Sequence, residues 1–193
     1  MVYDLHIGDR TFSSWSLRGW LMMEKFNIPH RTHLVGLYTH TMAADLAGLA
    51  PARLVPVMRT PDGTVVGETM AMAETLAEAF PDRGMWPTHP AARATARWLC
   101  AEMTSGFSAL RGACPMQLEH VNAGFTAPDA ARNDLARIET LWTHAATYKT
   151  KGPWLFGAYS LADAFYAPVC ARIIGYNLPV SDGARAYCMT TIT

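Results

Sequence analysis

The chain has 193 residues, of which 50% are apolar and 17% are charged, so it can bury a sizeable core and is not a disordered protein. Sixteen basic residues balance sixteen acidic ones, which argues against nucleic acid or a polybasic membrane surface as partners. No apolar run approaches the roughly 18 residues of a membrane span, and Asp4 and His6 interrupt the run that a signal peptide needs, so we expect a cytoplasmic protein.

The first 80 residues predict a small α/β domain. Periodicity and turn signals predict strands over 2–7, 31–35, 54–59 and 65–66, and helices over 16–26 and 69–80. Pro29 and Pro81 end the two helices, because a proline disfavours the helical conformation of the residue before it. The turn Pro61-Asp62-Gly63 joins the last two strands into a hairpin. The predicted order is βαβ, a connection, and then ββα.

The composition changes between Pro81 and Pro90, where three prolines and one glycine surround a lone Trp86. We therefore predict a linker over 81–89 between a domain at 1–80 and a domain at 90–193. The second domain is predicted to be all-helical, with helices over 90–108, 128–148, 161–174 and 183–190. Ser160 is an expected N-cap, and Asp163 is the acid that can reach back to its amide.

Several kinds of site are excluded by the motifs. The four cysteines, Cys100, Cys114, Cys170 and Cys188, form no CxxC pair, which excludes a zinc ribbon and a thioredoxin-type redox motif. The chain has no HExxH, GxxxxGK[ST], GxGxxG or GxSxG. We therefore expect no metal site and no metalloprotease, P-loop or hydrolase chemistry.

A serine cluster follows the first predicted strand. Ser13, Ser14 and Ser16 surround a helix start, where free amides and the helix dipole favour a negative group. One serine is enough to cap the helix, so three hydroxyls exceed what capping needs. This turn suits an anion, and a thiolate is one candidate.

Two further motifs lie beside predicted strands. Pro56 follows Val55 at the start of a strand, where a proline marks an edge, a bulge or a cis peptide bond. A cis bond would turn the Val55 backbone outward toward a peptide-like ligand. Glu68 and Thr69 lie between a strand and a helix. They either cap that helix or hold an amino-acid-like head group.

These three motifs, in this order, resemble the glutathione transferase family over nearly the whole chain, and the serine cluster is nearest to the serine-type, zeta-like bacterial branch. The resemblance implies an α/β thioredoxin-like N-terminal domain (βαβ-ββα), an all-α helical C-terminal domain, a homodimer, and glutathione as cosubstrate. It places Ser13, and next Ser14, beside the glutathione sulfur. The implied glutathione-binding residues are Val55, Pro56, Glu68 and Thr69, with Arg53 or His40 toward the glycine end.

The function that follows is attack of a glutathione thiolate on a small electrophile. A serine hydroxyl and the helix N-terminus would stabilise the thiolate. The expected electrophile pocket consists of Trp98, Met103, Phe107 and Arg111. A non-catalytic glutathione-binding module remains an alternative, and so does an isomerase of the maleylacetoacetate type, although Trp15 stands where the zeta class usually has cysteine.

Overall fold

The computed structural model describes residues 1–122 and 124–193. It divides into two compact units, Met1–Arg83 and Gly84–Thr193. Their boundary falls inside the segment that we expect as a linker. In the described ranges, no helix combines the length and the apolar character needed to cross a membrane.

The first unit is built on a four-stranded mixed sheet. Its strands are β1 (Tyr3–Ile7), β2 (His30–Leu34), β3 (Val57–Arg59) and β4 (Val65–Gly67). They lie in the order β2-β1-β3-β4. β1 runs parallel to β2 and antiparallel to β3, and β3 and β4 form an antiparallel hairpin. The predicted order of elements, βαβ and then ββα, is confirmed.

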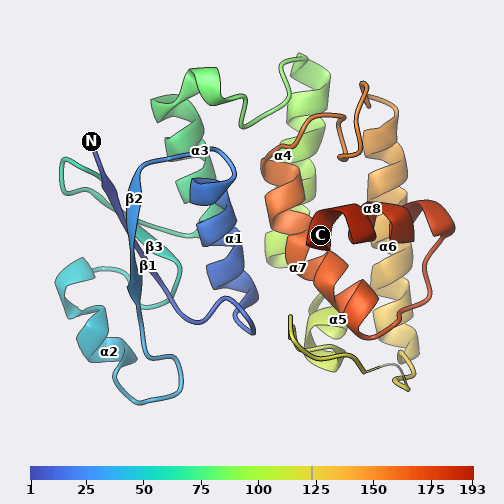
Figure 1. Cartoon of the computed structure of the whole chain (residues 1–193), viewed down its shortest axis with the longest axis horizontal. Coiled ribbons are helices and arrows are strands. Elements are labelled where there is room, and N and C mark those ends of the chain that lie inside the picture. Colours follow the sequence, from blue (N-terminus) through green and yellow to red (C-terminus); the bar gives the residue numbers. More distant parts are fainter. Residues whose placement is uncertain (123) are drawn as a thin grey trace. The chain divides into compact units, whose positions relative to one another are not determined.

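Helices lie on both faces of this sheet (Figure 1). Helices α1 (Ser14–Glu24) and α3 (Thr69–Ala79) cover the face to which the buried Leu5 points. The short helix α2 (Met42–Asp45) and a 3-10 helix (Ala47–Leu49) precede β3. They close a small apolar cluster on the other face, formed by Val35, Leu46, Leu49 and Val57.

The remainder of that second face carries a polar cluster. The carboxylate of Asp4 accepts hydrogen bonds from Arg31 Nε at 2.9 Å, His33 Nε2 at 2.9 Å and Arg59 Nη2 at 3.2 Å. The ring of His6 stacks on the ring of His33, with 4.5 Å between their centroids. These residues come from β1, β2 and β3, because alternate side chains of neighbouring strands share one face.

The second unit contains five helices among its described residues, and no ladder of paired strands. They are α4 (Pro90–Ser105), α5 (Ser108–Ala113), α6 (Asp129–Ala146), α7 (Leu161–Gly175) and α8 (Asp182–Ile192). Helix α7 is buried on almost every side. At its start the Asp163 carboxylate accepts from the Ser160 amide at 2.8 Å, which confirms the predicted reach-back.

Several predicted boundaries differ from the structure by a few residues, and three of these differences have a local reason. The first helix begins at Ser14 rather than at residue 16, because Ser13 is the N-cap. The third strand begins at Val57 rather than at residue 54, because proline has no N–H to donate to a ladder. The helix expected over 90–108 ends at Ser105, and α5 then starts separately after Phe107, whose φ is 58°.

Candidate functional site

The turn between β1 and α1 holds the serine cluster in a hydrogen-bonded arrangement. Ser13 is the N-cap of α1, and its Oγ accepts from the Ser16 amide at 3.3 Å. The Ser13 hydroxyl donates to Ser16 Oγ at 2.8 Å. Ser16 Oγ also accepts from the Gly8 amide at 2.9 Å, which ties the end of β1 to the first turn of the helix.

Ser14 is the first residue of α1, and its half-buried hydroxyl makes no side-chain hydrogen bond with the described residues. Arg18, which is fully buried, donates through Nη1 to the Ser14 carbonyl oxygen at 3.3 Å. The Arg18 guanidinium lies over the Trp15 ring, 4.7 Å from its centroid. These two contacts hold the Arg18 guanidinium against the first turn of α1.

The peptide bond between Val55 and Pro56 is cis, which is one of the three alternatives that the sequence left open. Pro56 packs against α1 at Gly19, where an added Cβ would lie 2.7 Å from Pro56 Cβ. No hydrogen bond from the described part of the chain reaches the amide or the carbonyl of Val55. A backbone donor and a backbone acceptor are therefore open at the start of β3.

The third motif combines a left-handed residue with an unsatisfied hydroxyl. Glu68 has a φ of 60°, its side chain is exposed, and it precedes α3 without capping it. Thr69 is only 2% exposed, and its Oγ1 is buried without a hydrogen-bond partner in the described structure. Buried hydroxyls are normally hydrogen-bonded, and a non-glycine residue with positive φ costs on the order of 1–2 kcal/mol. The unpaired Thr69 hydroxyl and the positive φ of Glu68 occur at one helix start, and together they indicate a ligand-binding site.

The register of the sheet brings the three motifs to one end. Val57 pairs with Gly67 and with His6. Pro56 is therefore next to Glu68 along the hairpin, and both lie beside the segment that leaves β1. The serine cluster, the open Val55 backbone and the Thr69 hydroxyl thus surround the carboxyl end of β1, with two helix N-termini directed there.

The other predicted site residues are more dispersed. Arg53 and His40 are exposed, and no contact among the described residues links them to the three motifs. Trp98 is 48% exposed and donates to Glu102, whereas Met103 is completely buried. These two are five positions apart on α4 and therefore point from different faces, so the structure does not bring them into one pocket wall.

The end of α4 and helix α5 hold the remaining predicted residues. Phe107 is buried, and Arg111 donates to the Gly106 carbonyl at 3.3 Å. Cys114 is also buried, and burial raises the pKa of its thiol, an effect that Arg172 partly opposes. Such a thiol is a poor nucleophile at neutral pH.

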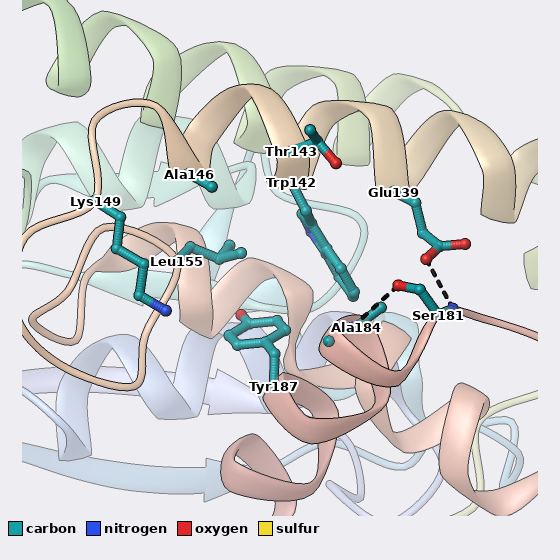
Figure 2. A pocket seen from close by; sticks show the side chains of 10 residues that line it. Glu139, Trp142, Thr143, Ala146, Lys149, Leu155, Ser181, Ala184 and Tyr187 are labelled. Atoms are coloured by element: carbon teal, nitrogen blue, oxygen red, sulfur yellow. Dashed lines mark hydrogen bonds between the residues drawn. The ribbon is translucent and has the colours of Figure 1, made fainter.

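A cavity of about 260 Å³ lies between α6 and the start of α8 in the second unit (Figure 2). Several of its polar groups are already engaged. Glu139 accepts from the Ser181 amide at 2.9 Å, Ser181 Oγ accepts from the Ala184 amide at 3.3 Å, and the Tyr187 hydroxyl donates to Asp163 at 3.1 Å. These bonds hold α8 in place, and the cavity contains none of the predicted site residues. Across the described residues, no cluster of three or more histidines, cysteines or acids could hold a metal ion.

The chain is similar to known proteins in both sequence and structure. Residues 12–79 match the family model described as "Glutathione S-transferase, N-terminal domain". A "probable maleylacetoacetate isomerase" from Caenorhabditis elegans is 32% identical over 117 residues, which are 60% of this chain and 53% of that protein. The chain thus spans about half the length of this curated relative.

Among solved structures, a glutathione transferase homologue from Burkholderia with bound glutathione is similar, with a TM-score of 0.69 and 20% identity over 99% of this chain and 91% of that one. Glutathione transferase Omega 3C from Trametes versicolor has a TM-score of 0.72 and 21% identity over 99% and 85%. The predicted fold class, a thioredoxin-like domain followed by an all-α helical domain, is confirmed.

Proposed function

We propose that this chain, whose residues 12–79 match a glutathione S-transferase N-terminal domain, is a serine-type glutathione transferase of the zeta-like bacterial branch. The observation that carries the proposal is the buried, unpartnered Thr69 hydroxyl at the start of α3, directly after Glu68 with its positive φ. Glutathione supplies a carboxylate that this hydroxyl can bind. The glutathione bound in the similar Burkholderia structure supports the same ligand.

The γ-glutamyl head group and the central cysteine of glutathione have complementary groups in the first unit. The exposed Glu68 carboxylate would pair with the α-ammonium group. The Thr69 hydroxyl and the free amides of α3 would bind the α-carboxylate, since a helix N-terminus favours an anion. The open amide and carbonyl of Val55 would pair with the amide of the central cysteine, as one strand pairs with another.

The cysteine thiol would then lie toward the start of α1. A free thiol has a pKa of about 8.5, so only a few per cent is ionised at neutral pH. Helix α1 has no acidic residue in its first turn, so its dipole favours the thiolate without local opposition. A hydroxyl hydrogen bond from Ser13 would lower the thiol pKa further, and the thiolate would then attack a small electrophile.

Ser13 and Ser14 compete for this donor role. The Ser13 proton points to a neutral hydroxyl, and rotation about the Cβ–Oγ bond redirects it to a charged acceptor, which forms the stronger bond. Ser14 has its proton uncommitted among the described residues. We assign the role to Ser13, because it lies at the N-cap beside the free amides.

We predict that Ser13→Ala slows conjugation at neutral pH by roughly ten- to a hundredfold, the cost of one hydrogen bond to a charged group. Glutathione binding should change little. Initial rates with a small electrophile, measured on both single variants, check this. Loss of rate in Ser14→Ala alone would transfer the role to Ser14, and full rates in both would show that neither serine assists the thiolate.

A second candidate is a glutathione-dependent isomerase of small organic acids, which the C. elegans relative favours. The same thiolate would add to the substrate and leave again, so that glutathione is regenerated. A non-catalytic glutathione-binding module is the third reading. The homodimer implied by the resemblance and the cytoplasmic location expected from the sequence belong to the proposal as well.

Calorimetric titration with glutathione, followed by assays with an electrophile panel and with maleylacetoacetate, separates these readings. Consumption of glutathione identifies the transferase, and turnover of maleylacetoacetate with glutathione regenerated identifies the isomerase. Binding without turnover identifies the module. Absence of binding contradicts all three.

A further inference from the structure

We infer that Ser16 is a positioning residue for the thiolate, acting through Ser13 as the inner member of a hydrogen-bond relay. The inference rests on the proposed function and extends it to a residue with no direct contact to glutathione. Its basis is the arrangement of three polar groups behind the start of α1.

The first observation is the environment of Ser16. Its side chain is completely buried, and its Oγ has two partners, the Gly8 amide at 2.9 Å and the Ser13 hydroxyl at 2.8 Å. The Gly8 amide can only donate. Among the described residues, the only acceptor that the Ser16 proton can reach is therefore Ser13 Oγ.

Each serine hydroxyl has a single proton to donate, so Ser13 cannot donate to Ser16 and to a thiolate at once. Without a ligand, Ser13 donates to Ser16. When the Ser13 proton turns to a thiolate, the contact between the two hydroxyls is retained only if Ser16 donates to Ser13. The bonds then run in one direction, from the Gly8 amide to Ser16, from Ser16 to Ser13, and from Ser13 to sulfur.

A one-directional chain is stronger than its separate bonds, because each donor that also accepts a bond becomes a better donor. Ser16 therefore raises the hydrogen-bond acidity of Ser13 and fixes its Oγ in place. The Gly8 amide fixes Ser16 in turn, because it belongs to the rigid end of β1. This assigns a role to the third serine of a cluster in which capping accounts for only one.

The test is the pKa of the bound glutathione thiol, measured by the ultraviolet absorbance of the thiolate as pH is varied. We expect Ser13→Ala to raise this pKa by about 1–2 units, and Ser16→Ala by a smaller amount, roughly 0.3–0.7 unit. Ser16→Thr, which keeps a hydroxyl, should restore the wild-type value. The double variant should match Ser13→Ala, because Ser16 acts only through Ser13.

Thr75→Ala is the control, since it removes a methyl group and a hydroxyl that donates within α3 to the Ala71 carbonyl, and the bound thiol should keep its wild-type pKa. If Ser16→Ala fails to fold, the Ser16→Thr and Ser16→Cys pair provides the same comparison, because a thiol is a weak donor. A wild-type pKa in Ser16→Ala beside a raised one in Ser13→Ala overturns the relay alone. The relay is also wrong if Ser16→Ala raises the thiol pKa by the same amount in the Ser13→Ala variant as in the wild type. An unshifted thiol in the wild type overturns both the relay and the proposed function.

Discussion

Thr69 and Ser13 are both hydroxyl residues at the starts of helices, and they differ in whether the described protein supplies a hydrogen-bond partner for the hydroxyl. The Ser13 hydroxyl accepts from the Ser16 amide and donates to Ser16 Oγ, so it stabilises α1 even without a ligand. The Thr69 hydroxyl is buried and has no partner among the described residues. Leaving a buried hydroxyl unpaired costs about 1–3 kcal/mol, and a bound carboxylate would remove that cost.

A pH-dependent contribution to stability comes from His6. Burial, and then the neighbouring His33 and Arg59, lower the pKa of His6 below its usual value, with Asp4 partly opposing. The unfolded chain therefore binds a proton at higher pH than the folded chain does. The contribution of His6 is present above a pH of about 6.5 and is lost as pH falls through the lower, folded pKa.

We predict that His6→Phe flattens the dependence of melting temperature on pH between roughly 7 and 5. The exposed His120 serves as the control, because His120→Phe should leave the slope unchanged. Asp4 affects stability in a separate and lower pH range. The hydrogen bond from His33, followed by those from Arg31 and Arg59, holds the pKa of Asp4 well below its usual value. An unaltered slope in His6→Phe would show that His6 does not take up a proton on unfolding in this pH range.

The residue types at the site could be predicted from the sequence. Which of their polar groups have a hydrogen-bond partner could not. Ser13, Val55 and Thr69 lie at the predicted starts of helices or of a strand, and these positions were enough to predict all three motifs. The lack of a partner for Thr69 depends on packing between elements, which local patterns do not contain. The same holds for Ser16, whose bond to Gly8 joins residues eight positions apart.

The contact between α1 and Pro56 depends on a single glycine. An added Cβ at Gly19 would lie 2.7 Å from Pro56 Cβ and 2.9 Å from its Cγ, closer than real side chains approach. Gly112 is also helical, and an added Cβ there meets nothing within 4 Å. The same substitution should therefore have opposite effects at these two positions.

We predict that Gly19→Ala lowers the free energy of unfolding by about 1–3 kcal/mol, the usual cost of overpacking. Gly112→Ala should raise it by up to about 1 kcal/mol, because alanine favours a helix. Denaturant unfolding measures both. Equal effects of the two substitutions would mean that α1 and Pro56 are not packed as described.

The start of α7 depends on a buried carboxylate. Asp163 accepts from the amides of Ser160 and Leu155 and from the hydroxyls of Ser160 and Tyr187. Burial raises the pKa of Asp163, and these four donors oppose the rise. Removing the carboxylate leaves buried donors unpaired at the most buried helix of the second unit.

We predict that Asp163→Ala destabilises the protein by about 2 kcal/mol or more, at the upper end of the range for a lost cap. Asp129→Ala, at the exposed start of α6, should cost much less. Thermal unfolding distinguishes the two. Glutathione affinity per folded molecule should be the same in both, and an unaltered melting temperature for Asp163→Ala would contradict the capping box.

Long elements were predicted well and short ones poorly, for a physical reason. Helix α6 shows several turns of apolar spacing, so its position follows from periodicity, and the start of α7 follows from Ser160 and Asp163. Helix α2 has four residues, too few to display a period. The break between α4 and α5 lies at Gly106, which is extended, and at Phe107, whose φ is 58°, and neither backbone conformation can be read from apolar spacing.

For the whole molecule, the sequence predicted an α/β unit before a helical unit, and the fold comparisons confirm that order. The expected electrophile pocket was predicted less well. Aromatic and methionine side chains on a helix have the same spacing whether they face solvent or a core, as Trp98 and Met103 show. The first unit therefore carries the stronger functional argument.

Binding of glutathione to the first unit through Thr69 can be measured by calorimetric titration of glutathione into wild type and Thr69→Val. Valine keeps the shape and removes a hydroxyl that has no partner in the described free protein. We predict an unchanged or higher melting temperature together with glutathione binding weakened by roughly 10- to 150-fold, while Thr69→Ser retains affinity. Wild-type affinity in Thr69→Val would show that the Thr69 hydroxyl does not bind glutathione.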